Sequence, residues 1–164
     1  MIVLVSDTSV LVDLERGQFL DSCFQLPFQF AVPDLLYKRE LEGIGGPEMI
    51  ARGLRIEELN KDELSVAQMI RSEHLKLSVP DAYAYSLALA RDWILLTGDG
   101  ELRALARERQ MPFHGVLWVL DQLFEGQVIG SAVLAAGLEI IASHPRCRLP
   151  RGDVQARLGR YRGE

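Results

Sequence analysis

Short aliphatic runs alternate along the chain with longer segments in which apolar and charged residues recur at helical spacing. The first run, Ile2 to Val5, has no polar position, which is typical of a strand buried on both faces. The pattern predicts strands at residues 2–5, 30–32, 54–59, 93–96 and 115–118. It predicts helices at residues 8–16, 34–43, 61–74, 81–90 and 100–109, and over most of the chain from about residue 120.

The order of these elements determines the fold class. Strands that alternate with helices favour an α/β fold, a three-layer sandwich with a mainly parallel central sheet. The 164 residues, 48% of them hydrophobic, are sufficient for one domain with its own core. In such sheets ligands bind beyond the carboxyl ends of the strands, near the point at which the strand order reverses. Functional side chains are therefore expected there.

Carboxylates follow two of the predicted strands. Asp7 comes after the first strand, Asp99 follows the run at 93–96, and Asp81 opens the most apolar helix. Each acid alone has a structural explanation, as a helix N-cap or as a charge at the positive end of a helix. Together they are expected to meet at one edge of the sheet, where their mutual repulsion favours a bound divalent cation. Oxygen ligands without His or Cys fit Mg²⁺ or Mn²⁺.

The charge is unevenly distributed. A net charge of −5 argues against a protein held on nucleic acid by a broad basic surface. The segment from Arg146 to the end nevertheless contains six arginines against Asp153 and Glu164. This basic tail is interpreted either as a solvated final helix after Pro150 or as a segment that contacts phosphates.

Other residue patterns exclude several classes of protein. The two cysteines, Cys23 and Cys147, have no metal-ligand spacing, and the three histidines lie too far apart for a zinc motif, so we interpret them as structural or surface residues. The apolar N-terminus has no basic leader and is too short to span a bilayer. A cytoplasmic protein without a membrane segment is expected.

The acids and their context resemble the signature of PIN domains. They stand in the order Asp7-Thr8-Ser9, Glu40 in VPDLLYKREL, Asp81 in LSVPDAYAYSLALA and Asp99 in LLTGD. The small chain is similar to the VapC-type toxin nucleases of toxin–antitoxin pairs, over roughly residues 2 to 118. The resemblance implies a PIN-like nuclease domain over residues 1–120. Residues 121–164 are expected to form a helical extension, packed on the same domain, with the basic tail.

The resemblance also implies roles for individual residues. It assigns the catalytic, metal-binding site to Asp7, Glu40, Asp81 and Asp99, with hydroxyl support from Thr8, Ser9 and Thr97. Glu42, two residues beyond Glu40, and Asp34 remain alternatives for the acid from the second helix. Glu101 stands near a place where relatives have a further Asp, so the resemblance implies no fifth ligand.

This set of residues suits metal-assisted hydrolysis of an RNA phosphodiester with Mg²⁺ or Mn²⁺. For a toxin, the resemblance further implies a small antitoxin partner and a homodimer. The alternatives are a catalytically weak PIN-like module that binds RNA or protein, and a receiver-like phosphoacceptor domain. The receiver reading is disfavoured because SDTS has one acid and HGVLW has no lysine. An aspartyl phosphatase is disfavoured because position 9 is Ser.

Overall fold

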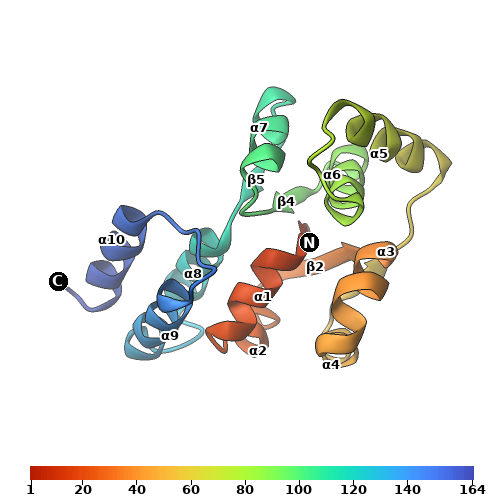
Figure 1. Ribbon diagram of the computed structural model, residues 1–164. Helices are drawn as coiled ribbons and strands as arrows, with labels where there is room; N and C mark the ends of the chain where they lie inside the picture. The colour runs from red at the N-terminus through yellow and green to blue at the C-terminus, as the bar shows by residue number, and fades with distance from the viewer.

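The computed structural model describes residues 1–164 and contains one five-stranded parallel sheet (Figure 1). The strands are β1 (Ile2–Ser6), β2 (Phe28–Pro33), β3 (Arg55–Glu57), β4 (Ile94–Leu96) and β5 (Phe113–His114). Their order is β3-β2-β1-β4-β5, with Leu4 opposite Ile94 in the register of β1 and β4. The chain therefore runs outward in one direction from β1 to β3, and in the other from β4 to β5. The strand order reverses between β1 and β4.

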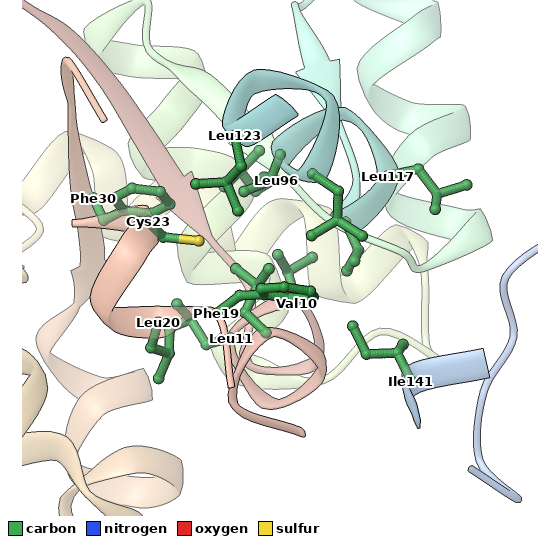
Figure 2. Close-up of a cluster of buried hydrophobic side chains, with 14 of the residues drawn as sticks. Val10, Leu11, Phe19, Leu20, Cys23, Phe30, Leu96, Leu117, Leu123 and Ile141 are labelled. Atoms are coloured by element: carbon green, nitrogen blue, oxygen red, sulfur yellow. The ribbon is translucent and has the colours of Figure 1, made fainter. Parts of the chain in front are cut away.

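Helices cover both faces of this sheet. The α-helices are α1 (Thr8–Arg16), α2 (Leu20–Cys23), α3 (Asp34–Leu36), α4 (Gly46–Ala51), α5 (Lys61–Glu73), α6 (Val79–Arg91), α7 (Gly100–Glu108), α8 (Val116–Glu125), α9 (Ser131–Ser143) and α10 (Arg151–Tyr161). Leu4 and Leu96 belong to the larger apolar core, with residues of α1, α8 and α9, part of which Figure 2 shows. Val5 and Leu95 belong to a second core with α5, α6 and α7. Successive strand residues thus point to opposite faces, and the predicted three-layer sandwich is confirmed.

The helix α6 is fixed in place by α5. The hydroxyl of Ser86 donates a hydrogen bond to the carbonyl of Glu63 (2.6 Å). The Arg91 guanidinium forms an ion pair with the buried carboxylate of Glu63 (3.0 Å), which lowers the pKa of that carboxyl. As predicted for a central helix, most of α6 is buried. This packing determines where Asp81, in its first turn, is held.

The C-terminal helices close the larger core. A Cβ atom on Gly137 of α9 would lie 2.2 Å from the Phe19 ring and 2.8 Å from the Gly17 carbonyl, so only glycine permits this approach to the end of α1. In α10, Val154, Leu158 and Tyr161 are buried in the same core. A fully solvated final helix is therefore wrong, because one face of α10 packs against the protein.

The predicted strand at residues 115–118 is wrong. Strand β5 is only Phe113–His114, and Gly115 precedes α8. A run of four apolar residues fits a buried strand and a buried helix equally well. Beyond this run, buried residues recur at helical spacing, at Val119, Leu120 and Leu123, and this longer pattern is the signal that favours a helix.

The predicted helix at residues 34–43 is helical but not one regular helix. After α3, a π-helical turn covers Tyr37–Leu41, and a 3₁₀ turn covers Glu42–Ile44. The short helices α2 and α4 were not predicted from the pattern. None of the helices combines the length and the apolar character needed to cross a bilayer.

Candidate active site

Asp7 lies at the carboxyl end of β1, beside β4, where the strand order reverses. Its backbone N–H donates to the Leu96 carbonyl (2.9 Å), which extends the pairing of the two strands. Its side chain is 2% exposed. Carboxylate Oδ1 accepts from the Val10 N–H (2.9 Å) and the Ser9 hydroxyl (3.0 Å), so Asp7 is the N-cap of α1. Oδ2 accepts from the hydroxyl of Thr97 (2.6 Å).

Burial raises the pKa of Asp7, and the hydrogen bonds from Thr97, Val10 and Ser9 oppose that shift. A carboxylate withdrawn from water loses solvation that neutral hydrogen-bond donors replace only in part. Asp7 is consequently both a helix cap and a carboxylate whose negative charge is disfavoured by burial. The capping explanation and the functional one do not exclude each other.

Thr97 couples Asp7 to Asp99. The fully buried Thr97 side chain donates to Asp7 and accepts from the Asp99 backbone N–H (3.0 Å). Asp99 in turn caps α7, because its Oδ2 accepts from the Leu102 N–H (2.9 Å). One hydroxyl thus fixes the distance between two acidic strand ends.

Glu40 reaches the same edge from the π-helical turn. Its Oε2 accepts a hydrogen bond from the Thr8 hydroxyl, in the first turn of α1. The two alternatives lie elsewhere: Glu42 is exposed, and Oδ1 of Asp34 accepts from the neighbouring Leu35 N–H (2.7 Å). A π turn adds one residue to a helical turn and so rotates the following side chains, and such turns are frequent at functional sites.

Asp81 completes the group from the first turn of α6. Burial raises its pKa to about 7, and the negative charges of Asp7, Asp99 and Glu40 add to the shift. Ser78, the N-cap of α6, accepts from the Asp81 N–H (3.2 Å). The charges of three acids from three other segments therefore act on Asp81.

The donor set fits a hard divalent cation. All candidate ligands are carboxylate oxygens, with hydroxyls behind them, and Mg²⁺ and Mn²⁺ prefer such ligands. In the present side-chain conformations, no group of three Asp, Glu, His or Cys residues is close enough together to bind one ion. The observation that favours a cation is the raised pKa of Asp81, because a positive charge would offset both the loss of solvation and the repulsion by like charges that cause it.

A cavity of about 1110 Å³ begins at these carboxylates and extends to the segment between α9 and α10. All four acids line it, as do Thr8, Ser9 and Ser78. Its other walls include Arg103, His114, Trp118, Arg146 and Arg148. The cavity is thus acidic at one end, and at the other end Arg146, Arg148 and Arg157 outnumber Asp153, which makes that end basic.

The sequence pattern missed the wall formed by Arg103, His114 and Trp118. Arg103 Nε donates to the Thr97 carbonyl (2.9 Å), which brings its charge beside the acidic edge. Burial and the charge of Arg103 lower the pKa of His114, so its ring is neutral at neutral pH. The excess of arginine in the tail was the only signal in the sequence that this side of the cavity is basic.

Comparison with known proteins identifies a family. The sequence profile of the PIN domain matches residues 3–159, nearly the whole chain and well into α10. A comparison with curated proteins finds no match. Since the match spans the strands, the four acids and the C-terminal helices alike, the chain belongs to the PIN-domain family.

Proposed function

We propose that this protein is a divalent-metal-dependent endoribonuclease that hydrolyses phosphodiester bonds in RNA. The observation that carries the proposal is the cavity that joins four carboxylates to a basic wall. A phosphodiester chain needs both ends of such a cavity, since arginines hold its phosphates and the acidic end holds the cation needed for cleavage. PIN domains are generally nucleases, which agrees with this assignment.

Asp7, Glu40, Asp81 and Asp99 would hold Mg²⁺ or Mn²⁺. An ion held there would lower the pKa of a water molecule, so that hydroxide is available as the nucleophile near neutral pH, and would offset the charge that develops on the phosphate. The remaining side chains orient the ligands. Thr97 and Ser9 fix the two oxygens of Asp7, and Thr8 holds Glu40. No side chain of the protein has to act as nucleophile.

The substrate is unpaired RNA in this proposal. An acidic pocket at the rim of a sheet repels a polyanion unless a cation and nearby arginines compensate, so the backbone must enter from the basic side. A single strand or loop bends into such a cavity more easily than a duplex does. Sequencing RNA ends after incubation of the pure protein with Mn²⁺ and total RNA tests activity and substrate together. Discrete new ends that chelation abolishes support the proposal, and an unchanged set of ends contradicts it.

We further propose that the protein is the toxin of a toxin–antitoxin pair and acts as a homodimer. A small antitoxin would place an arginine among the carboxylates, where a bidentate contact competes with the metal. Expression of the chain alone should arrest growth, and co-expression with the neighbouring small gene should relieve the arrest. A chain that is harmless alone and captures no such protein removes the toxin role and leaves the nuclease proposal intact.

The alternative functions have less support. In the doubly wound order of receiver domains, 2-1-3-4-5, β1 lies between β2 and β3, whereas here it lies between β2 and β4. The receiver alternative therefore lacks its topology. A module that only binds RNA would bind without producing new ends in the sequencing experiment.

A further inference from the structure

Two aromatic rings form one wall of the cavity next to the acids. His114 and Trp118 stack with ring centroids 4.1 Å apart and planes inclined by 7°, and both are half-buried. Phe28 supports Trp118 at 5.5 Å. The His114 carbonyl accepts from the Thr97 N–H (2.9 Å), and the Thr97 hydroxyl contacts Asp7. The aromatic wall is therefore one residue removed from the carboxylates.

Two arginines face the same cavity from the segment between α9 and α10. Arg146 and Arg148 are exposed and form no ion pair within the chain. Arg157, Arg160 and Arg162 in contrast are paired with acidic residues. The tail thus contains arginines engaged in folding and arginines whose charges lack a partner. The unpaired charges at the cavity are available to an anion.

The segment that carries these arginines is held in place. Asp121 of α8 accepts hydrogen bonds from Tyr161 (2.8 Å) and Arg157 (2.9 Å), which fasten α10 to the body of the protein. Within the segment, the Arg146 N–H donates to Nδ1 of His144 (3.1 Å). Arginines on such a fixed segment lose less freedom on binding than arginines on a loose tail.

We propose that the aromatic pair His114–Trp118 and the arginines Arg146 and Arg148 form a nucleotide subsite, in which an unpaired base packs against the rings and adjacent phosphates contact the arginines. The inference rests on the proposed nuclease function and names how its substrate is held. Aromatic rings beside a cationic groove are the usual means of binding single strands, and each stacked base contributes about 1–3 kcal/mol in such proteins. The volume of about 1110 Å³ exceeds that of ordinary small-molecule pockets, about 300–1,000 Å³, and leaves room for several nucleotides.

The chain contains only two tryptophans, which provides a direct test. Trp93 contacts Arg55 and Arg91 and does not line the cavity, so Trp93→Phe leaves Trp118 as the sole tryptophan, which is excited selectively over the four tyrosines. Titration in the cold with a short unpaired RNA oligomer in Mg²⁺ should quench Trp118 emission in a saturable manner. A duplex of the same sequence should not. In Trp118→Phe the remaining Trp93 emission should stay unchanged, and the parent chain serves as reference if Trp93→Phe does not fold.

The arginines are tested by affinity. Combined Arg146→Ala and Arg148→Ala should weaken RNA binding at least about tenfold and reduce the slope of log affinity against log salt by about 0.7 for each phosphate of the single strand that an arginine no longer neutralises. Arg151→Ala is the matched control, because Arg151 is exposed in the same region but does not line the cavity. Any of three results would contradict the subsite. The double variant and Arg151→Ala lose affinity equally, the RNA binds without quenching Trp118, or the RNA does not bind. Because binding is measured apart from cleavage, an inactive protein that still quenches contradicts the nuclease proposal alone.

Discussion

The hydroxyl of Thr97 donates a 2.6 Å hydrogen bond to the carboxylate of Asp7, from a residue 90 positions away in the sequence. This contact joins the ends of β1 and β4 where the strand order reverses. Both side chains are buried, and the same hydroxyl accepts from the Asp99 backbone. The geometry of the acidic edge therefore depends on a neutral residue.

Thr97→Val should destabilise the protein by about 2 kcal/mol, because it removes a hydrogen bond to a buried charged group at nearly constant volume. Urea unfolding at neutral pH measures the change. Thr97→Ser, which retains the hydroxyl, should recover most of the stability. If the valine and serine variants unfold alike, the hydroxyl is not what holds Asp7.

Asp7→Asn should raise the unfolding free energy in EDTA by about 1 kcal/mol. Asparagine caps a helix about as well as aspartate, and it removes a buried charge whose pKa burial raises. Burial is the cause that raises the pKa of Asp7, whereas repulsion by the other acids adds to the raised pKa of Asp81. In Mn²⁺ at about 100 times its Kd, the unfolding free energy of the parent should rise by about 2.7 kcal/mol. The stability advantage of Asp7→Asn over the parent should then shrink or reverse.

Thermal melts of the parent and of Asp7→Asn, each in EDTA and in Mn²⁺, measure how the metal changes their relative stability. Glu42→Gln is the control, since Glu42 is exposed and lies outside the cavity. This variant should melt at the same temperature as the parent, both in EDTA and in Mn²⁺. Identical melting temperatures in all four samples would show that Asp7 caps a helix and binds no metal.

Asp81→Asn should change the pH dependence of stability. The pKa of Asp81 is about 7 in the folded protein and about 3.9 when unfolded, so protonation favours the native state. This contribution is complete below about pH 4 and is lost as the pH rises through about 7. In EDTA the variant should therefore become more stable relative to the parent as the pH rises from about 4 to about 7, with little further change above that. A constant difference across that range contradicts the raised pKa.

Glu40→Gln removes a carboxylate from the proposed metal site and should lower RNA cleavage at least about 10-fold, no less than the loss of an outer-shell partner costs, with little change in RNA affinity. Glu42→Gln should leave cleavage within about twofold. The two positions are separated by one residue, yet only Glu40 lines the cavity. Initial rates of cleavage of a labelled oligomer distinguish them, and equal rates would remove Glu40 from the site.

Much of the fold could be predicted because local pattern and tertiary environment agree. The buried strand β1 is an unbroken aliphatic run, and the α6 segment is apolar on nearly all sides. Since parallel strands end at one edge, the approach of Asp7 and Asp99 followed from the order of elements alone.

The surroundings of the acids could not be predicted in the same way. A period of 3.6 residues predicts a regular helix over residues 34–43 and contains no signal for the π turn that directs Glu40, rather than Glu42, to the cavity. The stacking of His114 on Trp118 could not be predicted because the apolar residues 115–118 were assigned to a strand instead of the start of α8. The arginines Arg146 and Arg148 reach the site only through the packing of α10 on α8, a contact between distant segments.

One cleavage assay determines whether the carboxylates at this edge hold a metal that is needed to cleave RNA. Parent and Asp99→Asn are incubated side by side with an unpaired labelled RNA, in Mn²⁺ and in EDTA. Asparagine keeps the cap of α7, so the variant should fold, and RNA binding should persist. The parent should cleave the RNA in Mn²⁺ and not in EDTA, and the variant should cleave it at a rate at least about 100-fold lower. Cleavage that survives chelation, or equal cleavage by Asp99→Asn, would contradict the proposed metal site.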